Sequence, residues 1–191
     1  AVRKIGDSSI KFDGTGDYLS IPNSPDWDMG TGSFTVECWA RFDAVGVIDT
    51  IIERDFATNQ RALYIAKQAD NTINAQTGSG TGSISSITSS STVAADTWYH
   101  IAYVRDGTDF ELFIAGASVA TDSDAATMFD SDEQLLIGIH REGGSTSDPF
   151  DGYMDEIRIS DSARYTGAFT PSTTAFTADA NTKLLIHSNW T

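Results

Sequence analysis

The sequence predicts an all-β protein, a two-sheet antiparallel β-sandwich with little helix. Three observations lead there: apolar residues recur at every second position in many short segments, turn-forming residues fill the gaps, and no stretch keeps a helical period over three turns. At 191 residues, of which 40% are hydrophobic, the chain can bury a substantial core. We therefore expect a single domain over residues 1–191, with its core at about 10–187.

The predicted strands follow one another along the whole chain. The clearest covers 34–42, where apolar side chains at even positions alternate with polar or amphipathic ones. Segments 98–105 and 110–114 alternate as well, and the turn Asp106-Gly107-Thr108 between them is a strong hairpin signal. Shorter strands are predicted at 10–13, 18–21, 48–53, 62–66, 135–139, 153–160 and 183–187.

Three further segments are interpreted less directly. Segment 77–97 is rich in Ser, Thr and Gly around two isoleucines, and it fits either an edge hairpin or a loop. Residues 162–165 are the best candidate for one helical turn. Segment 181–191 either completes the sheet of this domain or begins a following module.

The composition excludes several classes of function. The formal net charge is -15, with 12 basic and 27 acidic residues, and binding to a phosphate backbone requires clustered Lys and Arg. No apolar run approaches the roughly 20 residues that span a bilayer. Cys38 is the only cysteine, so an intrachain disulfide cannot form. We expect neither nucleic acid as a partner nor insertion into a membrane.

Six motifs occur in a characteristic order. The first joins Phe12-Asp13-Gly14 to Asp17-Tyr18-Leu19, and the last is Phe150-Asp151-Gly152-Tyr153-Met154-Asp155; between them lie 32–39, 98–107, 112–116 and 135–138. Together they resemble the LamG-like jelly-roll group of the concanavalin A-like lectin/glucanase superfamily, which implies a concanavalin A-like jelly roll. Segments 24–32 and 163–171 are similar to modules of bacteriophage virion proteins, which implies a location on a virion surface or otherwise outside cells.

The resemblance also implies a structural calcium ion. In this superfamily the Asp of the penultimate strand, here Asp155, commonly binds Ca²⁺ with main-chain carbonyls near the N-terminus, here around Asp13 and Gly14. Calcium takes six to eight oxygen ligands at about 2.3 to 2.6 Å, so Asp151 and Asp17 could add oxygens. In the alternative, Asp155 accepts hydrogen bonds from backbone amides without metal, and the other aspartates serve turns.

Candidate ligand-binding residues are predicted from the face of the strand on which they lie and from the type of their side chains. Trp39, Glu37 and Arg41 point away from the core side of their strand, where an indole could stack on a sugar ring and the charged groups could bond its hydroxyls. Other polar or aromatic residues lie at strand ends or in loops that could rim the same face, namely Arg54, Tyr64, His140, Arg141 and Trp27. Trp39 as a packing residue, and the others as ordinary surface residues, are the alternatives.

We recognise no catalytic motif in the sequence. Retaining glycoside hydrolysis needs two carboxyl groups about 5 to 5.5 Å apart, and the residues that share a face with Glu37 are Trp39 and Arg41. We therefore predict a non-catalytic carbohydrate-binding or adhesion module of a phage virion, in a tail fibre or a head decoration, with a cell-surface glycan as partner. The alternative is a purely structural virion domain that binds other virion proteins or copies of itself as a homo-oligomer. The third hypothesis is a glycan-degrading enzyme.

Overall fold

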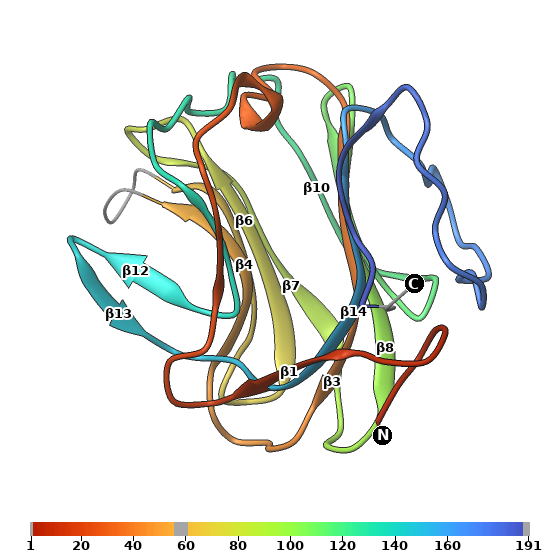
Figure 1. Ribbon diagram of the computed structural model, residues 1–191. Helices are drawn as coiled ribbons and strands as arrows, with labels where there is room; N and C mark the ends of the chain where they lie inside the picture. Colours follow the sequence, from red (N-terminus) through yellow and green to blue (C-terminus); the bar gives the residue numbers. More distant parts are fainter. Residues whose placement is uncertain (1, 56–60, 189–191) are drawn as a thin grey trace.

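The computed structural model describes residues 2–55 and 61–188. Two large antiparallel sheets pack face to face and enclose the core, so the predicted all-β sandwich is confirmed (Figure 1). A separate short hairpin, made of β12 (His140–Glu142) and β13 (Ser145–Ser147), projects beside the six-stranded sheet. In the described part of the chain, no helix is long and apolar enough to cross a membrane.

The seven-stranded sheet has the order β1-β14-β3-β8-β9-β10, with β15 also paired to β14. The strands are β1 (Ile10–Asp13), β3 (Phe34–Phe42), β8 (Trp98–Asp106), β9 (Asp109–Ile114), β10 (Ala117–Ser123), β14 (Asp151–Ser160) and β15 (Thr182–Ile186). One edge of β14 pairs with β3, and the other pairs first with β1 and then with β15. Strands from both ends of the sequence therefore share one partner strand, and residues 182–186 form part of this sheet.

The six-stranded sheet has the order β2-β11-β4-β5-β6-β7. Its strands are β2 (Leu19–Ile21), β4 (Asp49–Asp55), β5 (Arg61–Lys67), β6 (Thr72–Gly78), β7 (Ser83–Thr92) and β11 (Leu135–Ile137). Segment 77–97 takes the hairpin alternative, because β7 pairs with β6 and places Ile84 and Ile87 in the core. These isoleucines anchor an otherwise polar edge strand.

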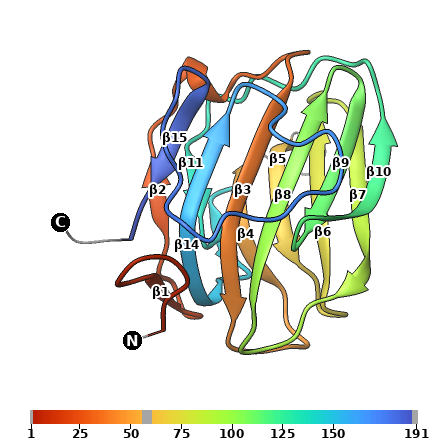
Figure 2. The ribbon, with the colours of Figure 1, turned by 90° about the vertical axis from the view of Figure 1, so that its right-hand side faces the viewer.

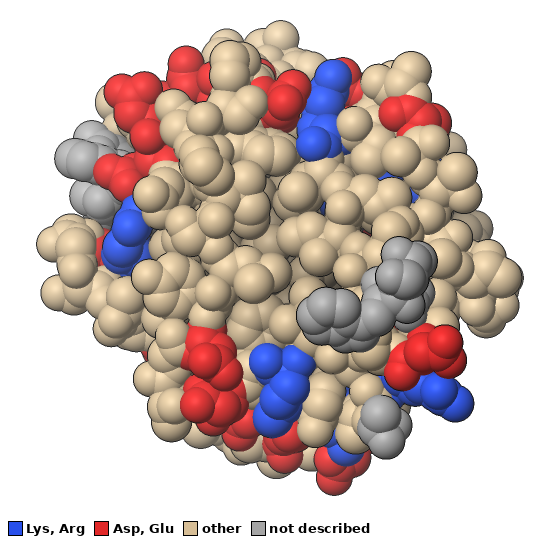
Figure 3. Space-filling view, in the orientation of Figure 1, with Lys and Arg blue, Asp and Glu red and all other residues tan. Residues whose placement is uncertain are grey.

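The core lies between the sheets and follows the predicted alternation. In β3, the side chains at positions 34, 36, 38, 40 and 42 all belong to the main hydrophobic cluster, while the intervening ones face outward. Charged side chains stay largely at the surface: on the face shown in Figure 3, Lys and Arg are scattered and neighbour Asp or Glu. No continuous basic surface is visible there, in line with the acidic composition.

Residues 161–181, here called the C-terminal strap, cross the outer face of the seven-stranded sheet (Figure 2). The helical turn predicted at 162–165 is wrong. The hydroxyl of Thr35 donates to the carbonyl of Ser162 at 2.8 Å and accepts the N–H of Arg164 at 2.9 Å. These backbone groups are therefore satisfied by the sheet beneath them and form no helical bond. Among the described residues, the one helix is a 3₁₀ turn, η1 (Pro25–Trp27).

Candidate functional site

The outer face of the seven-stranded sheet is closed where Glu37 and Trp39 lie. Glu37 is 2% exposed and accepts hydrogen bonds from Arg158 Nε at 2.8 Å and from the hydroxyl of Tyr165, in the strap, at 2.7 Å. Trp39 is 6% exposed and packs edge-on against His100 at 5.3 Å between ring centroids. These two predicted ligand-binding residues therefore lie under cover and form no open face.

The electrostatics of Glu37 identify it as a structural anchor. Burial alone would raise the pKa of its carboxyl, but the hydrogen bond to His100 and the charge of Arg158 outweigh that effect and lower the pKa. The carboxylate is consequently ionised and shared among sheet and strap residues. A buried charge with this many partners is costly to expose, so the strap is held firmly against the sheet.

Arg41, the third residue predicted on this face, pairs with Asp43 and Asp96. Its guanidinium also lies 5.3 Å from the ring centroid of Tyr153, whose ring is approached at 4.9 Å by the ammonium of Lys11. The cross-strand register places Lys11, Tyr153 and Arg41 side by side. Arg41 thus forms part of a row that joins β1, β14 and β3, on the sheet opposite Tyr64.

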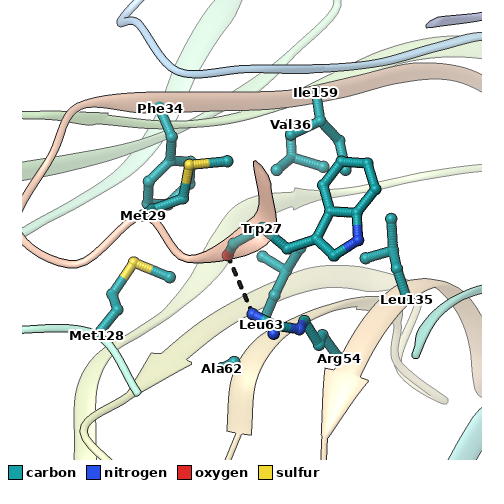
Figure 4. Close-up of a pocket in the computed structure, with 10 residues that line it drawn as sticks. All are labelled: Trp27, Met29, Phe34, Val36, Arg54, Ala62, Leu63, Met128, Leu135 and Ile159. Atoms are coloured by element: carbon teal, nitrogen blue, oxygen red, sulfur yellow. Dashed lines mark hydrogen bonds between the residues drawn. The ribbon is translucent and has the colours of Figure 1, made fainter. Parts of the chain in front are cut away.

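Arg54 points into the end of the core and is 1% exposed (Figure 4). It donates hydrogen bonds to the carbonyl of Trp27 at 3.1 Å, to Asp28 Oδ1 at 2.7 Å, to Asn23 Oδ1 at 2.8 Å and to the carbonyl of Ser131. The cavity that it lines with Trp27 has a volume of about 20 Å³. Such a space holds about one water molecule, so Arg54 and Trp27 join loops and do not bind a ligand there.

The residues predicted to bind calcium fall into two groups. Asp155 is fully buried and accepts hydrogen bonds from the N–H of Ile5 at 2.9 Å and from the hydroxyl of Ser188 at 2.7 Å. Asp13 pairs with Asp151 in the register of β1 and β14, four residues before Asp155. Four residues along a strand span about 13 Å, far more than two ligands of one ion can be apart. The predicted set of Asp155, Asp13, Gly14 and Asp151 therefore does not fit around a single calcium ion.

Local contacts agree with the turn alternative for the second group. The N–H of Gly14 donates to the carbonyl of Phe150 at 3.1 Å. Asp13 Oδ1 accepts the N–H of Thr15 at 2.9 Å, and this bond lowers the pKa of Asp13. Within 2–55 and 61–188, no three His, Cys, Asp or Glu side chains are arranged to hold a metal ion. Calcium binding by this chain stays a prediction.

Three of the predicted ligand-binding residues do come together, on the outer face of the six-stranded sheet. The rings of Tyr64 and His140 meet edge to face at 5.5 Å between centroids. Arg141 follows His140 in β12, and its N–H donates to Glu53 Oε1 at 2.7 Å. Glu53 is the cross-strand neighbour of Tyr64. The β12–β13 hairpin is thereby fixed beside β4 and β5, as a wall next to this face (Figure 1).

A chain of polar side chains continues across β5, β6 and β7. Arg61 Nη1 donates to Gln76 Oε1 at 2.9 Å, Gln76 Nε2 to Asn74 Oδ1 at 2.5 Å, and Asn74 Nδ2 to Thr88 Oγ1 at 3.0 Å. We call Arg61, Gln76, Asn74 and Thr88 the amide ladder. The guanidinium of Arg61 also lies 4.4 Å from the ring centroid of Tyr64.

The face opens toward β6 and β7. Tyr64 is 5% exposed and Asn74 7%, while Gln76 is half-buried and Thr88 is exposed. Burial raises the pKa of the Tyr64 phenol, so this group stays neutral and can both donate and accept hydrogen bonds. Neutral amides and hydroxyls beside an aromatic ring suit a ligand that carries many hydroxyl groups.

Sequence reasoning missed the amide ladder because strand β6 was not predicted. The signal was present: in 72–77 the polar Thr72, Asn74 and Gln76 alternate with Ile73, Ala75 and Thr77. Ile73 and Ala75 lie in the core. Period-two alternation in this segment would have placed both amides on the outer face.

The chain is similar to a known protein family and to several solved structures. Residues 13–166 match the family model described as concanavalin A-like lectin/glucanases superfamily. A candidate carbohydrate-binding protein of Bacteroides ovatus is similar at a TM-score of 0.72 and 16% identity over 93% of this chain, which spans about half (52%) of that protein. The CBM40 domain of the Ruminococcus gnavus IT-sialidase, bound to α2,3-sialyllactose, gives 0.68 and 14% over 84% of this chain and 92% of its own.

An animal protein is similar as well. The SAP-like pentraxin of Limulus polyphemus gives a TM-score of 0.60 at 16% identity, over 83% of this chain and 77% of its own. No curated protein sequence matches the chain. At these identities the likeness to solved structures concerns the fold.

Proposed function

Because the chain belongs to the concanavalin A-like lectin/glucanase superfamily, we propose that it is a non-catalytic module that binds a glycan on the outer face of its six-stranded sheet. The observation that carries the proposal is the amide ladder beside Tyr64. It places a half-buried amide, Gln76, and an exposed hydroxyl, Thr88, on one sheet surface beside the buried ring of Tyr64. Two structurally similar proteins have names that refer to carbohydrate binding, which supports the same ligand class.

The ladder is preorganised for such a ligand. Each amide is held by a neighbour, so little side-chain freedom remains to be lost when a sugar hydroxyl takes part. In the cross-strand row, Thr50 and Ala66 are fully buried while Thr88, beyond Asn74, is exposed, so the accessible part of this face lies over β6 and β7. A glycan chain is expected to lie over β6 and β7 and to approach the hairpin wall with one end.

The small number and the burial of the carboxylates on this face favour a binding role over catalysis. Among the described side chains of β4 to β7 that face outward, Glu53 is the one acidic group. Asp148, which follows the hairpin, adds a second carboxylate 3.6 Å from His140, but hydrolysis with retention needs two carboxyls that both reach the sugar. Glu53 already accepts the N–H of Arg141 and is 1% exposed. The proposed activity is therefore adhesion without turnover.

The proposed setting is the outside of a bacteriophage particle, where the module would attach a tail fibre or a head decoration to a host glycan. The support is the similarity of segments 24–32 and 163–171 to virion modules. A purely structural role, with virion proteins or copies of the chain as partners, is the competing function.

A glycan array followed by titration calorimetry on the best ligand tests the proposal. Gln76→Ala should weaken binding by about 5-fold, since it removes one set of hydrogen bonds worth roughly 1 kcal/mol. Ser118→Ala, on the exposed strand β10 of the other sheet, is the matched control and should leave the affinity unchanged.

Two outcomes would contradict the proposal. If no glycan binds, the structural role is favoured. If Ser118→Ala weakens binding and Gln76→Ala does not, the glycan lies on the other sheet. Thermal unfolding of each variant shows that the fold is retained.

A further inference from the structure

Lys67 and Asp49 form an ion pair inside the sandwich that the glycan site does not use. Both side chains are 0% exposed, and Lys67 Nζ lies 2.7 Å from Asp49 Oδ2. The two residues are cross-strand neighbours at the ends of β4 and β5. The ring of Phe42, a core residue, lies 5.6 Å from the ammonium. This pair is therefore screened from water by its surroundings.

The surroundings offer few partners to two full charges. Apart from Asp49, the acceptor that Lys67 contacts among the described residues is the carbonyl of Val47, at 2.5 Å from Nζ. A buried ion pair is stable only when its remaining donors and acceptors are satisfied, because both charges have lost their hydration. Burial also raises the pKa of Asp49, which favours the protonated form of its carboxyl group.

The two oxygens of Asp49 differ in their surroundings. Oδ1 accepts the backbone N–H of Asp151 at 2.9 Å, which polarises this oxygen as the carbonyl of an acid group. Oδ2 faces the lysine nitrogen. One oxygen is thus held by a fixed donor, and the other lies beside the nucleophile.

We propose that Lys67 and Asp49 condense to an intramolecular isopeptide bond. Proton transfer within the pair gives a neutral amine and a neutral carboxylic acid. The amine nitrogen attacks Cγ of Asp49, and the negative charge that develops on Oδ1 is stabilised by the N–H of Asp151. The C–Oδ2 bond then breaks, and Oδ2 leaves with two protons as one water molecule, so no other reactant is needed.

The product fits the contacts that are already present. The amide oxygen, formerly Oδ1, keeps the hydrogen bond from Asp151, and the amide N–H keeps its bond to Val47. A neutral amide has one donor and one acceptor group here, and both are satisfied. Burial of both groups and their 2.7 Å contact take the place of the activation that they would need in water.

The intact mass of the purified full chain tests the proposal. The wild type should be lighter than its sequence by the mass of one water molecule, and digestion should give a branched peptide that joins the segments around Asp49 and Lys67. Lys67→Arg should have its full sequence mass. Lys183→Arg is the matched control: Lys183 pairs with Asp161 at 2.9 Å but is half-buried, not enclosed in the core, so this variant should keep the mass deficit.

Either of two results would overturn the isopeptide bond. The first is a wild-type chain with its full sequence mass, which shows that the pair remains ionic. The second is a water loss that persists in Lys67→Arg, which shows that an Asp-Gly step such as Asp106-Gly107 has cyclised. The first test needs no variant, so it holds even if Lys67→Arg fails to fold.

Discussion

The carboxylate of Asp155 accepts a hydrogen bond from the backbone N–H of Ile5 at 2.9 Å. Its other oxygen accepts the hydroxyl of Ser188 at 2.7 Å, and the hydroxyl of Ser8 donates to the carbonyl of Ser188. One buried side chain in β14 therefore connects segments from both ends of the sequence. The contacts that join the two segments are hydrogen bonds between protein groups.

Asp155→Ala should lower the free energy of unfolding by about 2 to 4 kcal/mol, because the buried N–H of Ile5 and the hydroxyl of Ser188 both lose their acceptor. Chemical denaturation measures the change, and Asp109→Ala, at the exposed start of β9, is the control. We expect equal losses in calcium and in EDTA. A wild-type melting temperature that falls in EDTA, with no such fall in Asp155→Ala, would instead support the predicted ion.

Gly116→Ala should loosen the C-terminal strap. Gly116 has a φ of +81°, and an added Cβ would lie 1.9 Å from the carbonyl oxygen of Phe169 in the strap. We expect a loss of about 3 kcal/mol, from backbone strain plus the displaced strap. Gly107→Ala is the matched control, since Gly107 has a φ of +63° with open space around it and should cost only about 1 kcal/mol. Equal losses in the two variants would show that the strap does not depend on this contact.

Acid should destabilise the protein through Glu37. Its pKa is lowered in the folded state from the ordinary 4.5, so the unfolded chain binds the proton more readily. The stability from this group is present above pH 4.5 and is lost as the pH falls through the folded-state pKa. The pKa of Asp49 is raised in the folded state. As long as its carboxyl group has not reacted, Asp49 therefore favours folding at low pH, and this contribution is lost as the pH rises.

Melting temperatures of the wild type and of Glu37→Gln across this acid range measure the effect. The wild type should lose stability more steeply than the variant, in which position 37 no longer titrates. Parallel pH profiles would show that the carboxylate of Glu37 is not a source of the acid sensitivity.

Cys38 should resist alkylation in the folded protein. The thiol is buried in the core cluster, and burial raises its pKa to about 12, so the thiolate that reacts is scarce at mildly alkaline pH. Labelling with a thiol-reactive dye should be complete in denaturant and negligible without it. Rapid labelling of the native chain would mean that the sandwich opens near β3.

Apolar residues at every second position were enough to predict the sandwich. In a strand, successive side chains point to opposite faces, so the position of a residue in the strand decides which face it occupies. The inward set of β3 follows from this rule. The family was instead predicted from the resemblance of six motifs, and the match of residues 13–166 confirms it. Burial of apolar side chains on one face is a local property that the sequence carries by itself.

The binding surface was decided by tertiary structure. Trp39 and Glu37 face outward as predicted, but distant segments cover both: Tyr165 of the C-terminal strap bonds to Glu37, and the ammonium of Lys4 lies 3.9 Å from the ring centroid of Trp39. Tyr64 and His140 meet because β11 pairs with β4 and brings the hairpin alongside. Which face of a sheet stays open depends on where distant segments pack, and the pairing of Lys67 with Asp49 depends on cross-strand register. Neither is encoded in the spacing of residues along one strand.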